Sequence, residues 1–551
     1  MSSDVSKLFT RRATGLVREI GIGTAIIIAI CNVVGLGWQK KIFQGAGGAP
    51  LAETFAIHPI IMAFFLAGLI ILVSIYCFAV LSAAMPRSGG GYIFISRILN
   101  PGLGFVATWA QWGSVAISYG LIAVATMEAV TIFAGLAGIN TSGIENSTAL
   151  FILGVIIMVI FSSIATLGIK MTGRLLQVLF WIPAAVLVVI YILFILATPD
   201  TLAKGMQVLF GHSAEEYTQL ALSQGMATIA AGNNYLKAVY STFTGAYWAY
   251  IGYAAASFVA GEVKEAHKTL PRAMFTSGAV IILIYMSISF LLARTSQMIG
   301  RVNTPQGPFS FFSAISFLNY NSQSTGFGSL PTVGGWMPVI AAIQAAGMGI
   351  GRWFNFVIVL FAALWVANDI PPFILTSSRM VFAMAFDRLL PSFLADVDEK
   401  WHSPRNAIIF VSIASLVGAG GESGLFGRLG SWLFTGISDG WDVLFFGIVC
   451  LAALFFPTRK PDIFERSPFR ASKTVTQVIA ALAVIGNAIA GYFIFQGLDL
   501  LKDWFSTYWL VGWGFLIIWP LIGYLVYRYY SSRARATGVE LTTIFTEIPP
   551  D

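Results

Sequence analysis

The chain has 551 residues, of which 57% are hydrophobic and only 10% are charged. A soluble domain carries about 25% charged residues, so this composition excludes a soluble globule and indicates a protein that crosses a membrane many times. The net charge of +7 is not a nucleic-acid signal, because the basic residues fall in short loops where they orient spans. Cys31, Cys77 and Cys450 lie in apolar segments without metal-binding or disulfide spacing, so we expect no metal site and no cofactor.

A membrane-spanning helix needs about 20 mostly apolar residues. Uncharged runs that reach or approach this length predict twelve spans, at 20–38, 58–83, 103–134, 149–169, 175–198, 239–261, 272–293, 353–384, 406–421, 430–457, 474–497 and 505–529. The first run is too long for the core of a signal peptide, so we interpret it as a retained span.

The positions of the basic residues predict the orientation. With both termini in the cytoplasm, most of the 32 Lys and Arg residues lie in inner loops and tails, as the positive-inside rule requires. We therefore expect a multi-pass protein of the cytoplasmic membrane. If the uncharged segment 335–351 crossed the membrane, the basic loops that follow it would lie on the outer side, against the positive-inside rule. The segment is therefore predicted to be a re-entrant or capping helix on the outer side.

Two outer loops, 199–238 and 296–350, are long enough either to decorate the surface or to form a lid over a pathway. Glu128 falls near the outer end of the third span, where we expect it to be solvated.

The first span is interrupted by polar and small residues. Asn32, Gly35 and Gly37 lie within it, and a glycine costs about 1 kcal/mol in a helix interior relative to alanine. Inside a bilayer, unwound backbone is tolerated only where it is buried in protein or lines a cavity. The stretch therefore either packs closely against a neighbouring helix or is a break that binds a ligand.

The sixth span, with Gly245 and Gly252, is interrupted in the same way. Interrupted helices at corresponding positions of two five-helix halves are typical of transporters built from inverted repeats, with the substrate between the breaks near the midplane. The matching interruptions favour the binding interpretation.

Four stretches carry a family resemblance. They are 32–37, with its Gly-Leu-Gly; 84–92, which reads Ala-Met-Pro-Arg-Ser-Gly-Gly-Gly-Tyr; 248–252, followed by 261–264 and 270–272; and 378–385, followed by 390–391. In this order they resemble the helix 1 break, first inner loop, helix 6 region and helix 8 end of the amino acid–polyamine–organocation permeases. The resemblance covers about residues 15–470.

The resemblance implies an all-α membrane protein with twelve transmembrane helices. Ten of them would form a five-plus-five inverted-repeat core, similar to the leucine transporter, with helices 1 and 6 broken at the midplane and two further C-terminal helices. The corresponding segments are a cytoplasmic tail at 1–19, the first repeat at 20–198, an outer loop at 199–238, the second repeat at 239–457 with its outer loop at 296–350, an inner loop at 458–473, the last two spans at 474–529 and a cytoplasmic tail at 530–551.

The function implied is secondary active transport of amino acids by alternating access, as an exchanger or a proton-coupled symporter. No G-x-x-x-x-G-K-[ST] motif for ATP binding occurs. The main alternative is a polyamine or organic-cation carrier of the same fold. A non-transporting sensor and a membrane enzyme are weaker alternatives. The four histidines are scattered, without a H-E-x-x-H or G-x-S-x-G arrangement, so we do not expect an enzyme.

The resemblance also implies where the substrate binds. Backbone amides at the helix 1 break would hold a carboxylate, and backbone carbonyls at the helix 6 break would hold an ammonium group. The substrate-binding residues expected are Val34, Gly35, Leu36, Gly37, Trp248, Ala249, Tyr250, Ile251 and Gly252. The glycines also suit helix packing, and Trp248 also suits a lipid-facing or core position. Leu36 occupies a position where many relatives have serine.

Charged residues complete the candidate list. Asp369 lies within the eighth span beside two prolines, and ionisable residues at that depth are functional by default. It is a candidate to bind a proton, a cation or the substrate ammonium; otherwise it forms a structural pair or lies in outer-facing water. The inner-gate candidates are Arg87, Glu262, Lys264 and Arg379, each of which also suits ordinary cytoplasmic anchoring.

Two departures from the resemblance concern ion coupling. Pro183 occupies the position at which proton-coupled relatives place a lysine, and Ala254 a position at which some have a glutamate. A sodium site at Thr376, Ser377 and Ser378 is a further, weaker hypothesis.

Overall fold

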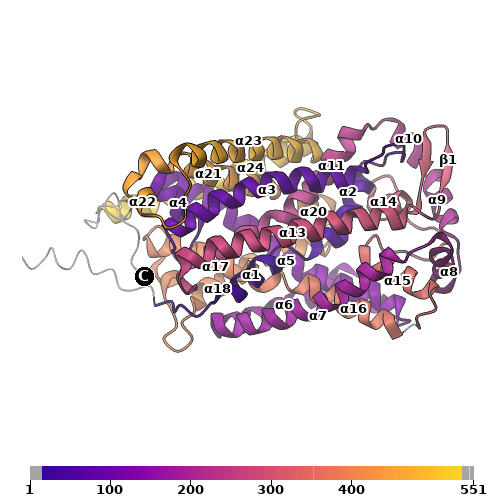
Figure 1. Cartoon of the computed structure of the whole chain (residues 1–551), viewed down its shortest axis with the longest axis horizontal. Helices are drawn as coiled ribbons and strands as arrows, with labels where there is room; N and C mark the ends of the chain where they lie inside the picture. The colour runs from indigo at the N-terminus through magenta and orange to yellow at the C-terminus, as the bar shows by residue number, and fades with distance from the viewer. Residues whose placement is uncertain (1–14, 352, 537–544, 546–551) are drawn as a thin grey trace, which may run out of the picture.

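The computed structural model describes residues 15–351, 353–536 and 545 (Figure 1). Most of the predicted N-terminal tail and the end of the predicted C-terminal tail lie outside these residues. The long helices run along the longest axis of the molecule (Figure 1). Short helices and a hairpin gather at one end, which we call the cap end. The opposite end, where the described chain finishes, is called the tail end.

Nine helical runs of the described chain are long and apolar enough to cross a membrane. They are α3 (Pro59–Ala84), α5 (Pro101–Leu136), α6 (Ser147–Thr166), α7 (Ile169–Ile195), α13 (Ala266–Ser296), the pair α16 (Trp353–Ala367) and α17 (Ile370–Phe386), α21 (Asp439–Arg459), α23 (Lys473–Gly497) and α24 (Thr507–Ala536). Each overlaps one predicted span. A mostly helical, multi-span membrane protein is therefore confirmed.

The remaining three predicted spans are interrupted helices. The first consists of α1 (Ile22–Cys31), a non-helical stretch at 32–35, the π-helix η1 (Gly37–Lys41), which follows the helical Leu36, and α2 (Ile42–Gly48). The sixth consists of α11 (Tyr235–Tyr250), the 3-10 turn η3 (Ile251–Ala254), α12 (Ala255–Phe258) and the 3-10 turn η4 (Ala260–Glu262). The ninth is divided into α18 (Arg405–Ala414) and α19 (Leu416–Glu422).

The two broken helices touch at their breaks. The side-chain amide of Asn32 donates to the carbonyl of Gly252 over 3.3 Å, and a Cβ added at Gly252 would lie 1.8 Å from the carbonyl oxygen of Asn32. A Cβ at Gly37 would lie 2.3 Å from the Cβ of Ala249. At either position a residue with a Cβ atom would overlap the other broken helix, so glycine is required for this close approach.

The two long loops form a single cap. The first contains α8 (Pro199–Phe210), α9 (Ala214–Ser223) and α10 (Met226–Ala231). The second contains the antiparallel pair β1 (Val302–Thr304) and β2 (Gly307–Phe309), then α14 (Phe311–Tyr320) and α15 (Met337–Gly347). A Cβ at Gly205 of α8 would lie 1.8 Å from the carbonyl oxygen of Ile343 in α15, so these helices are in backbone contact. The helix predicted within 335–351 is present as α15.

Short elements complete the bundle. They are η2 (Ser142–Ile144), α20 (Gly427–Trp432) and the π-helix η6 (Leu433–Ile437), together with α4 (Gly91–Ile98), η5 (Ser392–Ala395) and α22 (Pro461–Arg466). The segment before α1 joins the tail end through a parallel bridge between Ile20 and Val263, with the Ile20 amide donating to the Glu262 carbonyl over 2.9 Å.

The contact between the breaks predicts a strong effect of a single methyl group. Gly252→Ala should destabilise the fold by about 1 to 3 kcal/mol, the usual cost of overpacking a filled interior, because the new Cβ overlaps the Asn32 carbonyl. The measurement is the thermal unfolding midpoint of the purified protein in detergent. The matched control is Gly23→Ala in α1, where an added Cβ meets nothing within 4 Å. Equal midpoints for the two variants would contradict the close approach.

Candidate functional site

The unwound backbone of the first span is hydrogen-bonded by side chains of this chain. The Gln39 side-chain amide donates to the carbonyl of Gly35 over 3.2 Å. The Tyr285 hydroxyl, from α13, lies within hydrogen-bond distance of the Val33 carbonyl and, at 3.0 Å, of the Ala249 carbonyl in α11. Tyr285 therefore links the two breaks. Ala249 and Gly252, predicted to receive an ammonium group, already accept from Tyr285 and Asn32.

Asp369 lies directly against the helix 1 break. The prolines that follow it occupy the first turn of α17, and helix α16 ends at Ala367, so a short interruption places the carboxyl there. The Asp369 carboxyl faces the backbone amide of Leu36, and a Cβ added at Gly35 would lie 2.0 Å from its Oδ2. The structure thus brings Asp369 together with the amides that the sequence assigns to a substrate carboxylate.

The other residues predicted to bind substrate are buried around this point. Val34 and Leu36 are fully buried, and Ile251 lies in η3. The Tyr250 ring packs against Tyr285 with 4.8 Å between ring centroids. Trp248 is 8% exposed, and the Lys41 ammonium lies 5.1 Å from its ring centroid. Trp248 is therefore buried inside the protein rather than facing lipid.

Several buried polar atoms near the breaks have no hydrogen-bond partner within the described chain. They are Asn32 Oδ1, Gln39 Oε1, both side-chain polar atoms of Asn368, Asp369 Oδ1, Tyr250 Oη and Thr376 Oγ1. Buried polar groups are normally satisfied, so such a set suits a region that binds a polar solute or water.

The hydroxyls of the weaker sodium hypothesis are mostly engaged locally. Ser377 and Ser378 donate to carbonyls of their own helix, at 2.5 Å to Phe373 and 3.2 Å to Leu375. The described residues contain no group of three or more His, Cys, Asp or Glu side chains that could hold a metal ion. Pro183, at the position of the expected coupling lysine, is buried inside α7, and Ala254 is buried in η3.

At the tail end, Glu262 and Arg379 form a buried ion pair between η4 and α17. The guanidinium donates from Nη2 to Oε1 over 2.7 Å and from Nε over 3.1 Å, and both side chains are 1% exposed. The other two inner-gate candidates do not join this pair. The Lys264 side chain is exposed, and Arg87 donates to the neighbouring carbonyl of Pro86 over 3.4 Å.

At the cap end, Lys40 lies between two carboxylates. Its ammonium is 2.5 Å from Glu128 of α5 and 2.7 Å from Glu422 of α19. The prediction that Glu128 is solvated is wrong, because its side chain is only 19% exposed. The prediction that the first span ends at residue 38 is also wrong. The helix continues through Lys40 because two acids neutralise that charge inside the protein.

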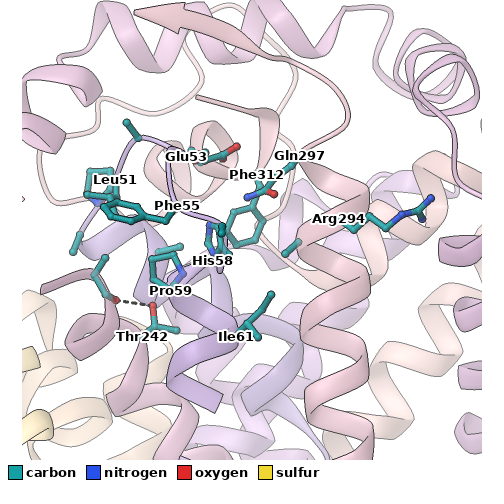
Figure 2. Close-up of a pocket in the computed structure, with 18 of the residues that line it drawn as sticks. Leu51, Glu53, Phe55, His58, Pro59, Ile61, Thr242, Arg294, Gln297 and Phe312 are labelled. Atoms are coloured by element: carbon teal, nitrogen blue, oxygen red, sulfur yellow. Dashed lines mark hydrogen bonds between the residues drawn. The ribbon is translucent and has the colours of Figure 1, made fainter. Parts of the chain in front are cut away.

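A cavity of about 280 Å³ opens at the cap end between the loop before α3 and helices α11, α13 and α14. Figure 2 shows His58, Phe312 and Glu53 close together, whereas the guanidinium of Arg294 on α13 points away from them and donates to the Phe194 carbonyl over 3.2 Å. Burial lowers the pKa of His58 to about 4, so the ring is neutral at physiological pH. Burial also raises the pKa of Glu53, against the opposing effect of Ser310 and Ser313, which donate to it over 2.5 and 2.6 Å.

Sequence reasoning missed the role of Lys40, because charged residues were used to end a span. The sequence does contain one indication of this role: Lys40 and Lys41 follow the break within about one helical turn, too close to it for the helix to end there. The sequence likewise gives no sign that Arg97, one of the basic residues of the inner loops, is buried and paired with Asp387 at the end of α17 over 2.6 Å.

Comparison of the sequence with known proteins identifies the family. The sequence model of the family described as "Amino acid permease" matches residues 20–516. The methylthioribose transporter of Bacillus subtilis (strain 168) is 23% identical, with 95% of each chain covered. The branched-chain amino acid permease BcaP of Lactococcus lactis subsp. cremoris (strain MG1363) is 22% identical, covering 94% of this chain and 93% of the relative. The human large neutral amino acids transporter small subunit 2 is 23% identical, covering 81% of this chain and 71% of the relative. The chain belongs to the amino acid permease family and is a transporter, not an enzyme.

Proposed function

We propose that this protein is a secondary active transporter of amino acids that works by alternating access, with its substrate site between the two helix breaks. The observation that carries the proposal is the contact of the two interrupted helices at Asn32 and Gly252, beside a set of buried, unpartnered polar atoms. Amides at a broken helix attract a carboxylate, and free carbonyls attract an ammonium group. Backbone groups can therefore recognise the part that all amino acids share.

Two closures support alternating access. The pair Glu262–Arg379 joins the sixth span to the eighth at the tail end, and Lys40 joins the first span to the third and the ninth at the cap end. Each closure includes one of the broken helices, which would have to move to admit a solute. We propose that the tail end faces the cytoplasm and that the cap is an outer lid.

The architecture proposed is twelve spans, ten of them in a five-plus-five inverted repeat. Its support is the pairing of an interrupted first helix with an interrupted sixth, five spans apart, as expected for such repeats. Leu36, Ala254 and the aromatic rings of the site favour a neutral, apolar amino acid. Two relatives are named for large neutral or branched-chain amino acids.

One observation favours a second candidate. Asp369 is a buried carboxyl without a basic partner among the described residues, and such a group is suited to pair with an amine. A polyamine or another organic cation is therefore the alternative substrate. One relative is named for a substrate that is not an amino acid, methylthioribose.

Uptake into proteoliposomes tests the function. All twenty amino acids, putrescine and methylthioribose are offered as competitors of labelled L-leucine and of labelled putrescine. We expect a neutral apolar amino acid such as L-leucine to be transported, with no inhibition by putrescine. Liposomes without protein and liposomes with Gly23→Ala provide the background and the active control. Inhibition or uptake confined to putrescine, with no amino acid active, would overturn the proposal.

The tail-end closure can be tested separately. Glu262→Gln leaves the buried Arg379 without its counter-charge, and losing one partner of a buried ion pair costs about 3 to 5 kcal/mol. We therefore expect this end to open more often. The readout is the rate at which a hydrophilic maleimide labels a Ser257→Cys reporter on α12, a position that is fully buried. The rate should rise about tenfold or more, since each 1.4 kcal/mol is worth a factor of about 10.

The matched control for that experiment is Glu265→Gln. Glu265 is exposed and reaches only Lys268, at 3.5 Å, so the labelling rate should stay at the wild-type value. The same variants without Ser257→Cys measure labelling of the native cysteines, which are buried. An unchanged rate in Glu262→Gln would show that the pair does not hold this end closed.

A further inference from the structure

The Asp369 carboxyl occupies the place at which the proposed substrate would bind its own carboxylate. Its Oδ2 and Oδ1 lie 2.0 and 2.3 Å from the position of a Cβ on Gly35, and the carboxyl faces the Leu36 amide. A substrate carboxylate directed to the same amide would meet this side chain. The donors of the break can serve one of the two carboxylates at a time.

Among the described residues, none with a positive charge faces Asp369 to allow two carboxylates to coexist there. Asp369 is 2% exposed and its Oδ1 has no hydrogen-bond partner. The titratable groups of the described chain that face it are the Cys31 thiol at the end of α1 and the Tyr285 hydroxyl on α13. No lysine, arginine or histidine of the described chain acts on its charge.

Two carboxylates held close together do not both stay ionised, and one of them keeps a proton. The α-carboxyl group of an amino acid is a stronger acid than the aspartate side chain, and its carboxylate would accept a hydrogen bond from the Leu36 amide. The proton therefore belongs on Asp369. A protonated carboxyl needs no counter-charge and adds an O–H donor.

We propose that Asp369 couples transport to protons by competing with the substrate: its carboxylate fills the helix 1 break in the empty carrier, and it leaves the Leu36 amide and takes up one proton when the substrate carboxylate binds. This inference rests on the proposed function. The proton enters from water on the side where the substrate binds. It returns to water on the other side, when the substrate leaves and the carboxylate bonds to the break again. The stoichiometry is one proton for each amino acid.

The sign of the pH dependence tests this directly. The dissociation constant is measured by calorimetry on the purified protein for L-leucine, or for whichever of the twenty amino acids the uptake panel selects, between about pH 5 and pH 8. Because the bound state holds one more proton, binding should tighten as pH falls, by up to about tenfold per pH unit where the empty carrier is deprotonated. Asp369→Asn, which keeps the shape without the charge, should bind with little pH dependence.

Two further variants keep the test specific. Asp369→Glu retains a carboxyl and should retain the slope. Asp442→Asn removes another buried carboxyl, which accepts from Ser114 over 2.7 Å in a different part of the bundle, and it should also retain the slope. Each variant must elute as a single species with a cooperative thermal transition. If Asp369→Asn does not fold, titration of the wild type in two buffers of different ionisation enthalpy still counts the protons, and about one should be taken up per substrate bound.

Every other outcome overturns the inference. Binding that weakens on acidification would identify Asp369 as the counter-ion of a cationic amine, because protons would then compete with the substrate. Binding without pH dependence in the wild type, or a slope that survives Asp369→Asn, would make Asp369 a structural residue while leaving amino acid transport intact. If no amino acid binds at all, the proposed function fails together with the coupling.

Discussion

The structure depends on one constraint, that backbone groups inside a membrane must find hydrogen-bond partners within the protein. The helix of the first span is interrupted at 32–35, where the N–H groups donate to nearby backbone carbonyls and carbonyls accept from side chains. Tyr285, distant in the chain, reaches the Val33 carbonyl, Gln39 reaches the Gly35 carbonyl, and the Asp369 carboxyl faces the Leu36 amide. Because these partners come from α13, the break itself and the α16–α17 junction, the break determines how those helices pack.

The same partners make the site responsive to a solute. A zwitterion offers one carboxylate and one ammonium group, and each can replace a bond that the empty protein makes to itself. The exchange costs little when bonds are replaced rather than lost. In the transport cycle that we propose, the exchange moves Asp369 and Tyr285, which lie on helices connected to the tail-end pair and to the sixth span. In that cycle, binding of a solute changes the positions of the Glu262–Arg379 pair and of Lys40 directly, through the helices that connect them to the site.

Much of the fold was predictable because membrane helices follow simple rules of length and apolarity. Nine predicted spans are continuous helical runs, and the breaks at Gly35–Gly37 and Gly252 were visible as glycines and an asparagine in apolar surroundings. The errors have one physical origin. A charge after an apolar run predicts the end of a span, whereas Lys40 continues the helix because Glu128 and Glu422, remote in sequence, neutralise it. Likewise, the sequence marked Asp369 as unusual, but only the packing of α17 against α1 places it on the Leu36 amide.

The central claim is that substrate and Asp369 exchange places at the helix 1 break. The most direct measurement is an electron cryo-microscopy map of the protein with a bound amino acid. The account predicts density for the solute between 35–37 and 249–252, with its carboxylate at the Leu36 amide and the Asp369 carboxyl turned away. An amino acid bound elsewhere, such as in the cap-end cavity beside His58, with Asp369 still on the Leu36 amide, would contradict it.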